Sequence, residues 1–162
     1  MAKRPQNLWT FISTVPPFGL SPWAPGTFGS IAGLPLGFLL LYWLGPVSLD
    51  LGVGQLAGWL GVLLGLGVLS YVAIRKTEEL WKVHDDKSIV VDEVVGQVLA
   101  MAACDMVWWQ IGLSFLLFRV LDIAKPGPIG YVDRRGGAFS TLGDDVIAGL
   151  VVGLGFFVFQ VF

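Results

Sequence analysis

The stretch "LGVGQLAGWLGVLLGLGVLSYVAI", residues 51–74, contains no charged side chain. As an α-helix, a stretch of this length is about 36 Å long, which exceeds the roughly 30 Å hydrocarbon core of a bilayer. It therefore predicts a membrane-spanning helix that crosses with some tilt, and the polar run "RKTEELWKVH" continues the same helix. Small residues allow close helix packing in membranes, and this helix carries six glycines: Gly52, Gly54, Gly58, Gly61, Gly65 and Gly67.

Apolar segments recur along the rest of the chain. The 162 residues are 55% hydrophobic and only 14% charged. A soluble domain of this size cannot bury that many apolar side chains in its core. Prolines and glycines interrupt residues 1–26, which indicates an N-terminal loop or interfacial segment. We expect an all-α integral membrane protein, residues 1–162 forming a single domain. It would be a small bundle of about five transmembrane helices, at about 27–44, 51–75, 89–105, 108–124 and 145–162.

The basic residues indicate how such a bundle is oriented. Five spans place the N-terminus, residues 75–88 and residues 125–143 on one side, together with nine of the ten Lys and Arg residues. The positive-inside rule makes that side cytoplasmic, so the N-terminus is predicted to be cytoplasmic and the C-terminus periplasmic. These nine are Lys3, Arg4, Arg75, Lys76, Lys82, Lys87, Lys125, Arg134 and Arg135.

Charge and cysteine content exclude several classes of function. The net charge of −2 indicates no nucleic-acid partner. The chain has one cysteine, Cys104, so it predicts neither an internal disulfide nor a cysteine metal cluster.

Carboxylates interrupt the apolar segments where ionisable groups normally mark function. The stretch "IVVDEVVGQ", residues 89–97, contains Asp92 and Glu93. If the third and fourth spans form a hairpin turning near Val107, Asp92 and Asp122 each lie roughly 22 Å from the turn, at one depth. Several carboxylates in one pocket require a compensating cation, and oxygen ligands favour Mg²⁺, Mn²⁺ or Ca²⁺. The candidate ligands are Asp92, Glu93, Asp122, Asp144 and Asp145.

Basic residues flank Asp122 on its predicted helix. Arg119 lies one turn before it and Lys125 one turn after it, so bases that can bind an anion adjoin acids that can bind a metal. This combination suits a phosphate substrate. Arg119 could instead be only the ion-pair partner of Asp122, and Asp144 and Asp145 could simply cap the last helix.

Two further residues allow both a structural and a functional interpretation. Thr27 is a possible helix N-cap, and its glycine neighbours would let a phosphate approach backbone N–H groups. His84, the single histidine, is either an interfacial residue or a general base.

Four sequence blocks resemble the phosphatidylglycerophosphatase A family: "GLSPWAPGTFGS", "VHDDKSIVVDEVVGQ", "FRVLDIAKPGPIGYVDR" and "DDVIAG". The resemblance implies a multi-pass, Mg²⁺-dependent lipid phosphatase of the bacterial inner (cytoplasmic) membrane. Such enzymes act on a phospholipid of the cytoplasmic leaflet, converting phosphatidylglycerophosphate to phosphatidylglycerol. No protein partner is predicted. By matching position, the family's acidic residues fall on Asp92, Glu93, Asp122, Asp144 and Asp145, and its basic and polar residues on Arg119, Lys125, Thr27, Ser30 and His84.

The residues also limit the mechanism. Cys104 is predicted at the opposite end of its helix from the acids, and one histidine cannot supply a two-histidine mechanism. An aspartyl-phosphate route stays open, although the chain has no D-x-D-x-T pattern. We expect water to attack with metal assistance, and the catalytic candidates are Asp92, Glu93, Asp122, Arg119 and His84. Lys125, Thr27 and Ser30 are the candidates for binding the substrate phosphate.

Two other classes of protein are compatible with parts of the pattern. A cation carrier could use the same carboxylates, but the far halves of the helices, "LAMAAC" and "VVGLGFFVFQVF", are apolar. A non-catalytic assembly subunit would explain the glycines and leave the carboxylates unexplained.

Overall fold

The computed structural model describes residues 5–84 and 86–162, and these form helices and connecting turns without a β-strand. The described elements are α1 (Leu8–Thr14), the short 3₁₀ helix η1 (Phe18–Leu20), α2 (Pro25–Leu44), α3 (Val53–Trp81), α4 (Val91–Met101), α5 (Trp108–Ala124), α6 (Pro128–Asp133) and α7 (Ala138–Phe159). The expectation of an all-α fold is confirmed for these residues. The polar run after residue 74 continues α3, as predicted.

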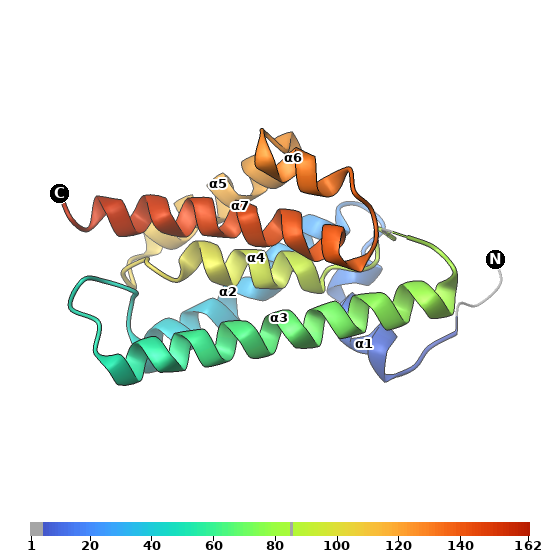
Figure 1. Ribbon diagram of the computed structural model, residues 1–162, viewed down its shortest axis with the longest axis horizontal. Coiled ribbons are helices and arrows are strands. Elements are labelled where there is room, and N and C mark those ends of the chain that lie inside the picture. Colours follow the sequence, from blue (N-terminus) through green and yellow to red (C-terminus); the bar gives the residue numbers. More distant parts are fainter. Residues whose placement is uncertain (1–4, 85) are drawn as a thin grey trace.

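The five longer helices alternate in direction (Figure 1). The helices α2, α4 and α7 begin at the end of the bundle where α1 lies, and α3 and α5 run the opposite way, so the C-terminus lies at the far end. Lys3 and Arg4, two of the residues on which the orientation was based, lie outside the described residues. The cytoplasmic position of the N-terminus stays a prediction.

Three of the described helices are long and apolar enough to cross a membrane: α2, α3 and α7. Within their apolar windows only 28%, 22% and 33% of the residues are buried inside the protein. Large apolar side chains such as Leu64 and Leu154 are exposed, an arrangement that suits a lipid environment and not water. The chain is therefore a membrane protein.

The count of five spanning helices is not reproduced, mainly because of α4. This helix has eleven residues and is only about 16 Å long, too short to cross the hydrocarbon core. All its residues except Glu93 are buried. The predicted span at 89–105 is therefore wrong: Ile89 and Val90 precede the helix, and Ala102 already follows it. The apolar residues of α4 pack against other helices instead of facing lipid.

Glycines on the flanking helices let α4 lie deep in the bundle, between α2 and α7. A Cβ atom added at Gly33 of α2 would lie 2.8 Å from the Cβ of Gln97, and one at Gly153 of α7 would lie 2.6 Å from the carbonyl oxygen of Leu99. On α3, by contrast, an added Cβ would meet nothing within 4 Å at four glycines. The close packing predicted for these glycines is therefore wrong: Gly54, Gly61, Gly65 and Gly67.

Replacing Gly149 by leucine should destabilise the bundle. A Cβ at this position would collide with the backbone of Gly96 and lie 2.9 Å from the Cβ of Leu99, so α4 and α7 must separate. We expect a loss of about 2 kcal/mol or more, seen as a lower midpoint of thermal unfolding in detergent. Gly61→Leu is the matched control because its side chain meets open space. Equal midpoints for the two variants would contradict the contact.

The N-terminal segment is more ordered than the predicted loop. Asn7 and Thr10 form a reciprocal capping box that starts α1. The hydroxyl groups of Ser13 and Thr77 are hydrogen-bonded at 2.7 Å, and the backbone N–H of Val90 donates to the carbonyl of Ser13. These contacts fix α1 to α3 and to the residue that precedes α4, where the acidic residues begin.

Candidate active site

All five predicted carboxylates line one cavity of about 140 Å³ at the end of the bundle, together with Asp133. The first turn of α4 supplies two of them, the last turns of α5 supply one, and α7 supplies two. The hairpin of α4 and α5 thus brings the predicted acids together, as expected from their equal distances to its turn. They are Asp92, Glu93, Asp122, Asp144 and Asp145.

Three of these residues have the arrangement of a metal site. One carboxylate oxygen each of Asp92, Glu93 and Asp145 lies within 4.8 Å of the others. Asp92 and Asp145 are buried, with exposed fractions of 5% and 3%. The Oε2 atom of Glu93 and the Oδ1 atom of Asp145 are buried without a hydrogen-bond partner. Unpaired anionic oxygens in a buried cluster repel one another, and a divalent cation with oxygen ligands would satisfy them.

The two acids of α7 lie deeper in the helix than predicted. The helix begins at Ala138, preceded by Gly137 with a φ of 82°, and not at 145. Residues 138–143, predicted to lie between the last two spans, therefore form the first turns of α7. The Ser140 hydroxyl donates a hydrogen bond to the carbonyl of Val132 at 2.6 Å, which joins these turns to α6 (Pro128–Asp133). Asp144 and Asp145 are therefore about two turns inside the helix, and their interpretation as caps is wrong.

Lys125 is held by two acids on the wall of this cavity. Its ammonium group donates to Asp144 at 2.7 Å and also to Asp133. Burial lowers the pKa of Lys125, but these hydrogen bonds outweigh burial and raise the pKa above its usual value. Lys125 is therefore a stable cation that neutralises acids of the protein. Asp133 was not among the predicted site residues, because its position in the charged run "YVDRR" does not distinguish it from a solvent-exposed acid.

Arg119 lies on the other side of the carboxylates. Its Nη1 atom donates to Asp122 at 2.6 Å and to the Ser30 hydroxyl at 3.3 Å, and that hydroxyl donates to the carbonyl of Gly26 at 3.1 Å. The predicted ion pair with Asp122 is thus present. The Nε atom of Arg119 is buried and has no partner, so the guanidinium keeps a donor for a further anion.

A second cavity, of about 400 Å³, contains this guanidinium. Thr27, Lys87 and Arg119 line it, and it shares Asp92 and Glu93 with the acidic cavity. The pair Asp92–Glu93 is therefore a wall between two cavities that differ in charge.

The three residues predicted to bind phosphate are not brought together. Thr27 lines the second cavity, Lys125 lines the acidic cavity, and Ser30 is buried behind Arg119. The N-cap of α2 is Ala24, which makes no side-chain capping bond, and Thr27 is the third residue of the helix. The N-cap interpretation of Thr27 is wrong because Pro25 already begins the helix, a position that its fixed φ favours.

His84 lies at the rim of the acidic cavity. Its side chain is 81% exposed, and its Nδ1 atom is 3.6 Å from a carboxylate oxygen of Glu78. It is therefore open to solvent and near the acids, a position in which an imidazole can exchange protons with water.

Fold and site together define a helical membrane protein with a buried carboxylate cluster suited to a divalent cation and an adjacent arginine suited to an anion. Comparison with protein families matches residues 11–160 to phosphatidylglycerophosphatase A. The chain belongs to the phosphatidylglycerophosphatase A family, and it is a phosphatase.

Individual relatives support this membership. Phosphatidylglycerophosphatase A of Escherichia coli is 33% identical over 90% of this chain and 79% of its own length. The protein of that name from Haemophilus influenzae is 42% identical over 82% of this chain and 76% of its own. A Bacteroides thetaiotaomicron protein named "Putative phosphatidylinositol-3-phosphatase" is 33% identical over 91% of each chain. No solved structure matches this chain significantly.

Proposed function

We propose that this protein is a Mg²⁺-dependent lipid phosphatase that hydrolyses the phosphate monoester of phosphatidylglycerophosphate to give phosphatidylglycerol. The observation that carries the proposal is the cluster of Asp92, Glu93 and Asp145 beside the unpaired Nε of Arg119. Names of the relatives from Escherichia coli and Haemophilus influenzae support the substrate.

Asp92, Glu93 and Asp145 would hold Mg²⁺, since their oxygens are close, buried and partly unpaired. When bound, the ion would polarise the phosphate and lower the pKa of a coordinated water. Asp122 and Asp144 line the same cavity but are bonded to Arg119 and Lys125. Their role in this proposal is to orient these two bases, and either acid could join the metal site.

Arg119 would offset the negative charge of the phosphoryl oxygens. The attacking water must lose a proton, and the glycerol oxygen must gain one as its bond to phosphorus breaks. His84 and the carboxylates that are not metal ligands line the acidic cavity, so they are the residues able to hold these protons. The products are phosphatidylglycerol and inorganic phosphate.

The location of the site agrees with a membrane-bound substrate. The acids lie at the start of α4, the end of α5 and the first turns of α7. These helix ends meet at one end of the bundle (Figure 1), a position that suits the depth of a phospholipid headgroup. Together with the positive-inside rule, this supports a multi-pass protein of the bacterial inner membrane that faces the cytoplasmic leaflet.

A cation carrier is the alternative, and the cavities do not favour it. Of the residues of α4, only Asp92 and Glu93 line the two cavities. Deeper in the bundle Val98, Met101 and Phe118 are fully buried and apolar. A flux assay in liposomes distinguishes the two, because a carrier moves cations without releasing phosphate.

Phosphate release from phosphatidylglycerophosphate in detergent micelles tests the proposal. We expect release that requires Mg²⁺, stops on chelation by EDTA and resumes when Mg²⁺ is restored. Phosphatidylinositol 3-phosphate is the comparison substrate, because one relative carries that lipid in its name. Faster turnover of the inositol lipid, or release unaffected by EDTA, would contradict the assignment.

A further inference from the structure

We propose that the lipid headgroup enters from the membrane between α2 and α5, into the cavity that holds Arg119, whereas the acidic cavity on the opposite side of Asp92 and Glu93 is open to ions and water. This division rests on the proposed function, since it concerns the substrate of the same site. It assigns phosphate recognition to Lys87 and lipid access to Ile123, two residues without an assigned role.

The charges of the two cavities support the division. The acidic cavity is lined by six carboxylates and one lysine, and that lysine is already bound to Asp133 and Asp144. A phosphate dianion approaching from this side meets mainly carboxylates, and the one lysine there is already paired. The cavity between α2 and α5 contains three carboxylates, Asp86, Asp92 and Glu93. It also contains two bases, Arg119 and Lys87, so it is much less negative than the acidic cavity and these bases can attract an anion there.

Donors in the second cavity are available for a phosphate. The Nε atom of Arg119 is buried without a partner. The start of α2 also borders this cavity, and it has no capping side chain, so its positive dipole end and its first N–H groups are free to meet an anion. Gly26 keeps this space open, because an added Cβ would lie 2.5 Å from the Oε1 atom of Glu93 and 3.3 Å from the Nη2 atom of Arg119.

The flank of the second cavity on the side of α5 is apolar. Ile123 is part of its lining and is 72% exposed. Val120 and Leu116, one and two turns earlier on α5, are also exposed, so the three residues form a lipid-facing stripe that ends at the cavity. Phe28, near the start of α2, is also exposed. The rim of the acidic cavity is polar instead: His84, Gly136, Gly137 and Thr141 line it.

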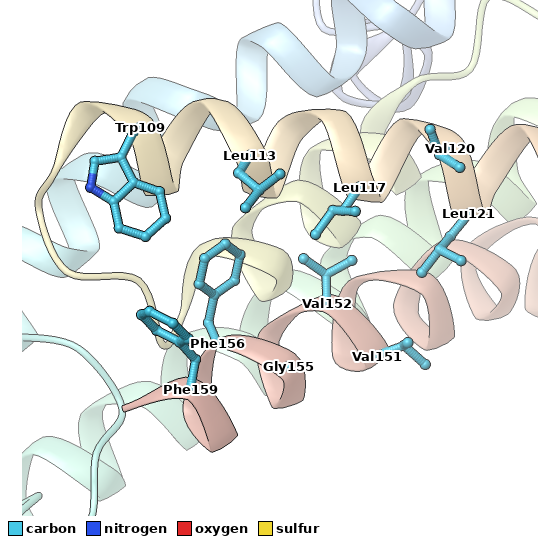
Figure 2. A pocket seen from close by; sticks show the side chains of 10 residues that line it. All are labelled: Trp109, Leu113, Leu117, Val120, Leu121, Val151, Val152, Gly155, Phe156 and Phe159. Atoms are coloured by element: carbon cyan, nitrogen blue, oxygen red, sulfur yellow. The ribbon is translucent and has the colours of Figure 1, made fainter. Parts of the chain in front are cut away.

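An apolar groove lies between α5 and α7 (Figure 2), on the side of α5 that faces away from the Arg119 cavity. Its side chains run from Trp109 and Phe159 to Val120, Leu121 and Val151, and none carries a charge. This groove can hold hydrocarbon, but it offers no donor to a phosphate. The cavity at Arg119 is the place where charged donors and lipid-facing side chains meet.

The experiment measures turnover of dipalmitoyl phosphatidylglycerophosphate in micelles and its inhibition by inorganic phosphate. Ile123→Trp should raise KM for the lipid about tenfold by narrowing the entrance, and should leave phosphate inhibition within twofold, because the small ion still fits. Leu116→Trp is the matched control, since Leu116 is exposed on the same face and lines neither cavity. It should change neither quantity.

Lys87→Gln probes the phosphate end of the cavity. It should weaken both lipid affinity and phosphate inhibition about threefold to tenfold, whereas Lys76→Gln should change neither, because Lys76 is an exposed residue paired with Glu79. Wild-type behaviour of both Ile123→Trp and Lys87→Gln would overturn the assignment of the entrance. Failure of the wild-type protein to hydrolyse the lipid would instead refute the proposed function, so the two failures are distinct.

Discussion

Asp92→Asn should lower kcat for phosphatidylglycerophosphate by about a thousandfold, equivalent to about 4 kcal/mol of transition-state stabilisation. The amide keeps the size of the side chain and removes one anionic oxygen from a cluster whose ligand atoms lie within 4.8 Å of one another. Asp50→Asn is the matched control because Asp50 is exposed and lies outside both cavities. Near-normal turnover by a folded Asp92→Asn protein would refute the site.

The same variant separates a loss of metal binding from a loss of folding. In EDTA, Asp92→Asn should unfold at the same temperature as the wild type or higher, because it relieves repulsion among buried carboxylates. Added Mg²⁺ should stabilise the wild type by binding only the native state, with little effect on the variant. A variant that unfolds earlier in EDTA would show that Asp92 acts through structure.

Arg119→Lys should reduce kcat/KM by about a hundredfold, with most of the loss in kcat. Lysine keeps the positive charge but has no fork of donors. It cannot bond Asp122 and Ser30 as Arg119 does while also offering a donor in the position of Nε.

The matched control for this change is Arg75→Lys. Arg75 is an exposed arginine paired with Glu79 on α3, and its replacement should leave activity within twofold. A small effect of Arg119→Lys, similar to that of the control, would show that only the net charge at Arg119 matters and that its geometry does not.

The acids at the site could be predicted from the sequence because they interrupt apolar runs. An ionisable group is unfavourable there unless it has a function or a partner. Equal distances of Asp92 and Asp122 from the hairpin turn were enough to predict that they meet. Asp133 was not predicted, because the charged residues next to it in the sequence do not distinguish an acid that faces the cavity from one that faces solvent. Its contact with Lys125 depends on how α6 and α7 pack.

Only the structure shows which basic residue lines which cavity. Arg119 and Lys125 lie six positions apart on one segment and were expected to serve one phosphate. They face different cavities because the wall of Asp92 and Glu93 separates them. Helical periodicity gives the angle of a side chain around its own axis, and the neighbour at that angle is a property of the packed bundle.

The sequence by itself determined the helical membrane class, the family and the acids, because each depends on residue types and their order along the chain. The tertiary structure alone decided that α4 is a buried core helix and that Asp92 and Glu93 divide two cavities. Hydropathy reflects the free energy of transferring a side chain out of water. Lipid and the neighbouring helices are both apolar environments, so hydropathy does not distinguish a side chain that faces lipid from one that packs against another helix.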